Sequence, residues 1–192
     1  MKKWTVSKQQ LKSDPVYNSK LVSKFINCMI WDGKKSIAQR IFYDAMAIIR
    51  RSSVVVDSRI EARGSSSDKR GHSAELSRSS SSPASKDERR GSNELEVFEK
   101  AVNNVKPLLE VRSRRIGGAS YQVPMQVSPK RQQSLAFRWI IQSARSKKGK
   151  PMCSALADEL IDAYNGHGGA MTTRENIHRM AEANKAFAHF AW

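Results

Sequence analysis

The chain has 192 residues, with 34 Lys and Arg against 18 Asp and Glu, a formal net charge of +16 and a pI of about 10.2. This balance predicts an anionic partner, either nucleic acid or an acidic membrane surface. The sequence holds no long apolar run, and its N-terminus lacks the apolar stretch of a secretory signal. We therefore expect no membrane span and a cytoplasmic protein.

The composition changes between residues 52 and 93, which are rich in serine and poor in large apolar side chains. This segment holds eight Lys and Arg and six Asp and Glu, so about +14 of the net charge lies elsewhere. It is too polar to offset the entropy lost on ordering. We predict that 52–93 is a disordered insertion with local structure only over 53–60. It interrupts a single domain: residues 1–51 form an N-terminal arm and two helices, and residues 94–192 form the rest of the domain.

Apolar residues recur at helical spacing along both flanking parts, which predicts about six amphipathic helices in one domain. Pro, Gly and capping residues mark the helix ends. The expected ends are Asp14-Pro15 and Asp32-Gly33 for the first helix, Lys34 for the start of the second, Asn93 and Pro107 for the third, Ser128-Pro129 for the start of the fourth, Lys150-Pro151 and Gly166 for the fifth, and a Thr172–Glu175 capping box for the start of the sixth.

The segment between the third and fourth helices alternates apolar and polar residues, which predicts a two-stranded β-ribbon over about 108–127. A two-residue turn at Gly117-Gly118 would place Arg112 opposite Val123. A three-residue turn that includes Ile116 would instead pair Val111 with Val123, and it would leave Arg112 and Arg114 together on the other face. The second register collects one apolar face, so we expect it.

No sequence pattern for catalysis, a metal or a cofactor is present: there is no phosphate-binding loop, HExxH, GxSxG or CxxC. We expect no enzyme activity, metal or cofactor. Cys28 and Cys153 lie on apolar helical patterns, which favours two buried hydrophobic side chains.

Positive charge is concentrated in residues 106–151, which hold eleven Lys and Arg and one acid, Glu110. A ribbon, a helix and a loop with this charge are suited to phosphate contacts. The residues alone leave three hypotheses open: an RNA-binding structural protein, a DNA-bending protein with a ribbon arm, and an RNA-modifying enzyme. The last has the least support.

Three segments closely resemble the bacterial-type small-subunit ribosomal protein seven family: "SKLVSKFINCMIWDGKKSIAQRIFYDA", "VRSRRIGGASYQVPMQV" with "RQQSLAFRWI", and "RENIHRMAEANKAFAHFAW". They occur in the order typical of the family and cover most of the chain outside 52–93. The resemblance implies a mainly α fold with an extended ribbon. It also implies a primary binder of small-subunit rRNA that organises the 3′ (head) domain in the small subunit, near the exit-site tRNA, mRNA, and neighbouring head and platform proteins.

The resemblance also implies which side chains face RNA. The ribbon residues Arg114, Arg115, Gly117 and Gly118 are expected near tRNA. Those expected to bind rRNA are Lys34, Lys35, Arg112, Arg114, Arg115, Lys130, Arg131, Arg138, Lys147, Lys148, Lys150, Arg174, His178, Arg179 and Lys185. Trp139 is expected in the core.

Overall fold

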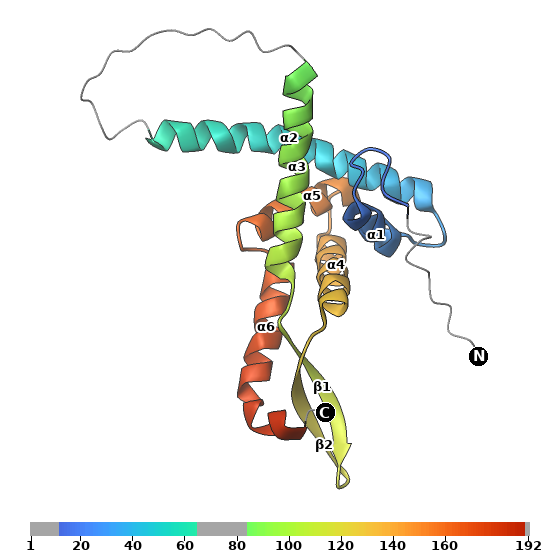
Figure 1. Cartoon of the computed structure of the whole chain (residues 1–192), viewed down its shortest axis with the longest axis vertical. Helices are drawn as coiled ribbons and strands as arrows, with labels where there is room; N and C mark the ends of the chain where they lie inside the picture. Colours follow the sequence, from blue (N-terminus) through green and yellow to red (C-terminus); the bar gives the residue numbers. More distant parts are fainter. Residues whose placement is uncertain (1–11, 65–83, 191–192) are drawn as a thin grey trace.

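The computed structural model describes residues 12–64 and 84–190, and of residues 53–64 and 84–93 it describes only the helical backbone. The fold is mostly helical, with a β-hairpin between the third and fourth helices, as predicted. Its elements are α1 (Lys20–Met29), α2 (Lys35–Gly64), α3 (Ala84–Val105), β1 (Leu109–Ile116), β2 (Ala119–Gln126), α4 (Pro129–Ser146), α5 (Met152–Tyr164), α6 (Gly169–Ala183) and the 3₁₀ helix η1 (Lys185–Phe190). Figure 1 shows the ribbon and α6 extending together away from the other helices.

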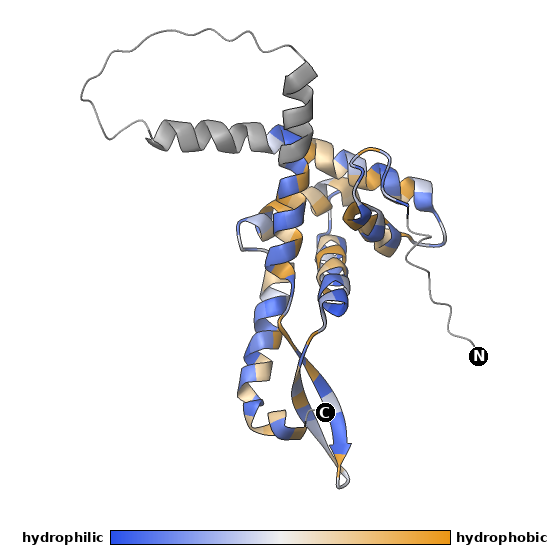
Figure 2. Cartoon of the chain, viewed as in Figure 1, coloured by the Kyte–Doolittle hydropathy of each residue, from blue (hydrophilic) through white to orange (hydrophobic). Residues whose placement is uncertain are grey.

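The helix α5 contributes Leu156 and Leu160 to the core, which lies where α1, α2, α3 and α4 meet. Four fully or nearly fully buried phenylalanines, one from each of these helices, form its centre. The ring of Phe25 lies 5.2 to 5.7 Å, centroid to centroid, from the rings of Phe42, Phe98 and Phe137. Trp139 is only 8% exposed, which confirms the prediction for it. Figure 2 shows apolar and polar residues alternating along these helices, as expected when each has one buried face.

The first helix begins later than predicted, and Asp14 has another role. Ser19 caps α1, because its hydroxyl accepts a hydrogen bond from the Leu21 amide at 3.3 Å. The Asp14 carboxylate accepts from the amides of Val16 and Tyr17, both at 3.2 Å, and from the Tyr43 hydroxyl at 2.7 Å. Asp14 therefore fixes a turn ahead of the helix and ties it to α2.

The predicted starts of the third and sixth helices were also wrong. Asn93 lies inside α3, which begins at Ala84. Thr172 lies inside α6, where its hydroxyl donates to the Gly168 carbonyl instead of capping the helix. The amide of Ala170, in the first turn of α6, donates at 2.9 Å to the carboxylate of Glu159 on α5. A side chain from another helix therefore supplies the cap that the sequence assigned to Thr172.

Both helices that flank the serine-rich segment extend into it further than predicted. The second helix continues to Gly64 and the third begins at Ala84, while residues 65–83 lie outside the described part of the chain. Extending a helix costs less free energy than starting one, and residues 52–63 contain no Pro or Gly to stop α2. The backbone of this segment is helical at its two ends, and the disorder expected for 52–93 stays a prediction.

The ribbon has the register that we did not expect. Arg112 pairs with Val123 and Arg114 with Tyr121, so Gly117 and Gly118 alone form the turn. Both glycines have positive φ, 56° and 89°, which is the conformation that a two-residue hairpin turn requires. The prediction weighed apolar matching above the turn, and the turn determines the register. Residues directly opposite one another share a face, so Arg112 and Arg114 lie on the face of Val123 and Tyr121, and Arg115 lies on the other.

The ribbon is supported by the C-terminal segment. Tyr121 lies 5.1 Å from Phe187 and 5.9 Å from Phe190, ring centroid to ring centroid. Val123 is fully buried although it faces Arg112 across the hairpin. Isolated two-stranded ribbons are only marginally stable, so these aromatic contacts stabilise the outward projection of the ribbon.

Candidate nucleic-acid interface

The turn between α1 and α2 presents the first two predicted cations, Lys34 and Lys35, both exposed. The amide of Lys34 donates to the carbonyl of Trp31 at 3.0 Å and closes a four-residue turn. Its central residues, Asp32 and Gly33, both have positive φ, 50° and 72°. Asp and Gly tolerate this conformation, which explains the sequence of the turn. The turn places both ammonium groups at the N-terminal end of α2, where the helix dipole also favours anions.

The exposed side of α4 carries a second group of cations. Lys130 and Arg138 are exposed there, and Arg138 lines a hollow of about 480 Å³ together with Cys28 and Arg145. The Arg145 guanidinium donates to the Met29 carbonyl at 3.2 Å, so the end of α4 is tied to the end of α1. Cys28 is exposed and Cys153 partly exposed, so the expectation that both are buried was wrong.

Arg131 and Arg112 meet the only acid of this basic segment. Arg131 Nη2 donates to Glu110 Oε1 at 2.6 Å, and Arg112 Nε to the same oxygen at 3.3 Å. The hydrogen bond from Arg131, assisted by that from Arg112, lowers the pKa of Glu110 despite its partial burial. A lowered pKa means that this contact stabilises the fold above the ordinary pKa of a glutamate and is lost as the pH falls through the lowered value. Arg131 therefore holds the base of the ribbon to α4, while Arg112 contacts the same carboxylate from within β1.

The loop between α4 and α5 carries three predicted cations, two of them paired with acids. Lys147 Nζ lies 2.9 Å from Glu159 Oε2 and 3.1 Å from Asp162 Oδ2, and Lys150 Nζ lies 2.6 Å from Asp158 Oδ2. Burial alone would lower the pKa of Lys147, but its bonds to Glu159 and Asp162 outweigh burial and raise it. Lys148 is exposed. Lys147 thus neutralises a fully buried carboxylate.

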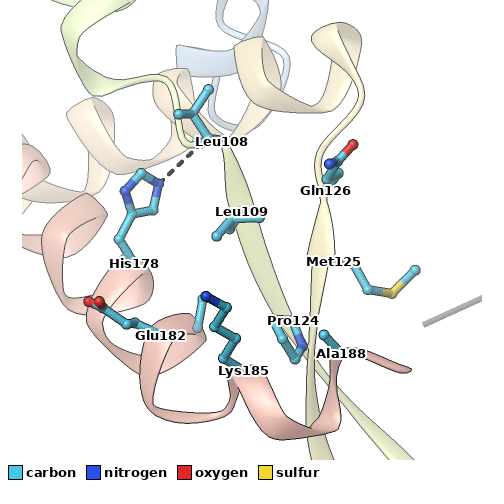
Figure 3. A pocket seen from close by; sticks show the side chains of 10 residues that line it. Leu108, Leu109, Pro124, Met125, Gln126, His178, Glu182, Lys185 and Ala188 are labelled. Atoms are coloured by element: carbon cyan, nitrogen blue, oxygen red, sulfur yellow. Dashed lines mark hydrogen bonds between the residues drawn. The ribbon is translucent and has the colours of Figure 1, made fainter. Parts of the chain in front are cut away.

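The predicted rRNA-binding residues of α6 and η1 also divide into side chains that bond within the protein and side chains that are exposed. Arg174 donates to the carbonyl of Asn104 at the end of α3, and His178 Nε2 accepts from the Leu108 amide at 3.1 Å. Figure 3 shows this His178 contact beside a hollow of about 750 Å³ that Leu109 and Pro124 of the ribbon and Lys185 of η1 also line. Arg179 and Lys185 are exposed. Arg174 therefore joins α6 to the end of α3, and His178 joins it to the start of the ribbon.

We expect the contact between His178 and the ribbon to weaken in mild acid. Burial, together with the nearby Arg174 charge, lowers the pKa of His178 below its ordinary 6.5. Because Nε2 must be unprotonated to accept from Leu108, the contact is complete above about pH 6.5 and is lost as the pH falls through the lowered pKa. The protection of the Leu108 amide, which is its exchange rate relative to the intrinsic rate at the same pH, should fall between pH 7 and pH 5. His178→Gln, which keeps an acceptor but does not titrate, should lack this dependence. An equal fall in protection in both proteins would contradict the assignment.

Two further residues of this surface are missing from the predicted set. Arg145 lies seven residues after Arg138, on the same face of α4, and this spacing could have revealed it. Trp31 is 65% exposed, and no periodic pattern distinguishes an exposed tryptophan from a buried one. Within residues 12–64 and 84–190, no group of His, Cys, Asp and Glu is placed to hold a metal ion, and no helix is long and apolar enough to cross a membrane.

Comparison with known proteins gives a consistent result. The profile of the family described as ribosomal protein S7p/S5e matches residues 1–185. The small ribosomal subunit protein uS7 of Rhodopirellula baltica is 49% identical over 188 residues, which cover 98% of this chain and 98% of that protein. Proteins of the same name from a Thermoanaerobacter species and from Thermotoga maritima are 46% and 45% identical, over 100% of this chain and 99% and 100% of their own lengths.

Proposed function

This chain belongs to the ribosomal protein S7p/S5e family, structural proteins of the small ribosomal subunit in translation, and we propose that it is a primary binder of small-subunit rRNA that nucleates assembly of the 3′ (head) domain. The observation that carries the proposal is the set of exposed cations at the turn between α1 and α2 and along α4. Lys34, Lys35, Lys130 and Arg138 are exposed in the structure, and Arg145 is tied to the end of α1 beside them. Side chains of this kind fix a protein on a phosphate backbone.

The ribbon supports a second part of the proposal, contact with the exit-site tRNA and the mRNA path. Gly117 and Gly118 form an open tip, where a Cβ atom would meet nothing within 4 Å beyond the glycine itself and its chain neighbours. Arg115 is exposed beside the tip, and Arg114 is partly exposed. Such a tip can approach a nucleic-acid backbone closely because no side chain intervenes. Neighbouring head and platform proteins complete the proposed partners, and the proposed location is the small subunit in the cytoplasm.

Competition binding tests the proposal. We expect the protein to bind the 3′ domain of small-subunit rRNA more tightly than duplex DNA of equal length at the same salt concentration. If roughly six to ten phosphates are contacted, affinity should fall about 10³- to 10⁵-fold between about 50 and 200 mM salt. Footprinting of the complex should protect nucleotides of the 3′ domain. Equal or tighter binding of duplex DNA would contradict rRNA recognition, and no feature of residues 12–64 and 84–190 favours a DNA-bending arm.

A further inference from the structure

Trp31 occupies an unusual position for a tryptophan in a helical protein. It lies two residues after Met29, the last residue of α1, and is 65% exposed, although Met29 is buried. The turn closed by the hydrogen bond from Lys34 to the Trp31 carbonyl keeps the two residues together. The indole is therefore held in a fixed place on the surface without contributing to the core.

One face of the indole is covered by a cation. The guanidinium carbon of Arg145 lies 4.9 Å from the Trp31 ring centroid, a distance typical of a cation–π contact. Arg145 is also anchored by its hydrogen bond to the Met29 carbonyl. Because the indole is so largely exposed, we infer that its other face is open to solvent. An anchored planar cation on one side orients the ring and leaves the other side available for a ligand.

The surroundings of Trp31 combine apolar surface with positive charge. Trp31, Arg145, Lys34 and Ile37, itself 48% exposed, line a hollow of about 240 Å³. Arg145 also lines the neighbouring hollow that contains Arg138. The exposed apolar surface of Trp31 and Ile37 thus lies next to cations at the turn between α1 and α2 and on the outer face of α4. Asp32 is the one acid of the turn, and its positive φ explains its presence there.

We propose that Trp31 stacks on an unpaired base of the small-subunit rRNA, while Lys34 and Arg138 hold phosphates on either side of that nucleotide. The inference rests on the proposed rRNA binding and adds a base contact to it. Unpaired RNA bases stack on aromatic side chains and on arginine planes, and Trp31 with Arg145 offers both. The cations beside the indole favour a nucleotide over the apolar surface of a neighbouring protein, which would leave those charges without counterions.

The test compares Trp31→Leu, which keeps apolar bulk but has no ring, with Trp31→Phe. Affinity for the 3′ domain of small-subunit rRNA should fall roughly 5- to 100-fold in Trp31→Leu and less in Trp31→Phe, because stacking of one base on an aromatic ring has this magnitude. The salt dependence of binding should stay as in the wild type, since no phosphate contact is removed. RNA-induced quenching of tryptophan fluorescence should weaken in Trp31→Leu. Val16→Ala, at another strongly exposed apolar residue, is the matched control and should bind normally.

Unchanged RNA affinity in Trp31→Leu would overturn the proposal, and poor incorporation of that variant into reconstituted subunits would then assign the indole to a protein neighbour. A loss in Trp31→Phe as large as in Trp31→Leu would also overturn stacking. If the proposed rRNA binding itself were wrong, the result would differ, because the wild-type protein would then show no preference for the rRNA.

Discussion

Replacing Lys147 with methionine should lower the free energy of unfolding by about 3 kcal/mol, because removing one partner of a buried ion pair leaves the other charge uncompensated. Glu159 is fully buried, and Lys147 Nζ lies 2.9 Å from its Oε2. The other oxygen, Oε1, accepts from the Ala170 amide and so holds the start of α6. Loss of the lysine should therefore disturb the junction of α4, α5 and α6.

Urea unfolding followed by circular dichroism at neutral pH measures this loss. Because its pKa is raised, Lys147 stabilises the fold fully at any pH below the ordinary pKa of lysine. This stabilisation is lost as the pH rises through the raised value. Lys148→Met is the matched control, because it removes the same charge from an exposed neighbour, and its stability should change by less than about 0.5 kcal/mol. Equal stability of the two variants would show that Glu159 does not need this partner.

Replacing Lys34 and Arg138 together with alanine should weaken rRNA binding at least about tenfold and reduce the slope of log affinity against log salt by about 2, roughly one unit for each lost phosphate contact. Both side chains are exposed, one at the start of α2 and one on the outer face of α4. Their removal should leave the melting temperature nearly unchanged. Filter binding over a series of salt concentrations gives both quantities.

The matched control removes the same formal charge from cations that face acids. Arg131 bonds to Glu110 and Lys150 to Asp158, so the Arg131→Ala, Lys150→Ala variant should change the salt slope much less. This comparison separates local contact from the general field of a protein with a net charge of +16. Equal losses in the two double variants would mean that the overall field, and not the position of Lys34 and Arg138, determines the binding.

Helix type and order could be predicted from the sequence, and the helix starts only where the signal is local. Ser128-Pro129 marked the start of α4 correctly because both residues act within one turn. Thr172 misled because Glu159, distant in sequence and on another helix, binds the first turn of α6. Asp14 misled because one of its oxygens accepts from the amides of Val16 and Tyr17, as an N-cap would, although only a turn follows; Tyr43 of α2 binds the other oxygen. No window of sequence contains these tertiary partners.

For the candidate site, counting charges located the basic segments but could not show which of their cations already contact acids. The sequence alone does not distinguish Arg131, Lys147 and Lys150 from Lys130 and Arg138. In the fold, however, each of the first three contacts a carboxylate. The register of the ribbon failed for a different reason. Two consecutive glycines at positive φ fix the turn. Tyr121 of β2 is then covered by Phe187, which lies beyond α6, and not by an apolar side chain on β1.

The support of the ribbon by η1 also has a consequence for the order of folding. The strands of the hairpin are adjacent in the chain, so their pairing needs only a short loop to close. Phe187 and Phe190, which cover Tyr121, follow only after α4, α5 and α6 have been synthesised. We expect the hairpin to form early and to gain its protection late, when the last helical segment docks. In chains that stop before Lys185, the amides of β1 and β2 should exchange faster than in the full chain, and equal rates would refute this order.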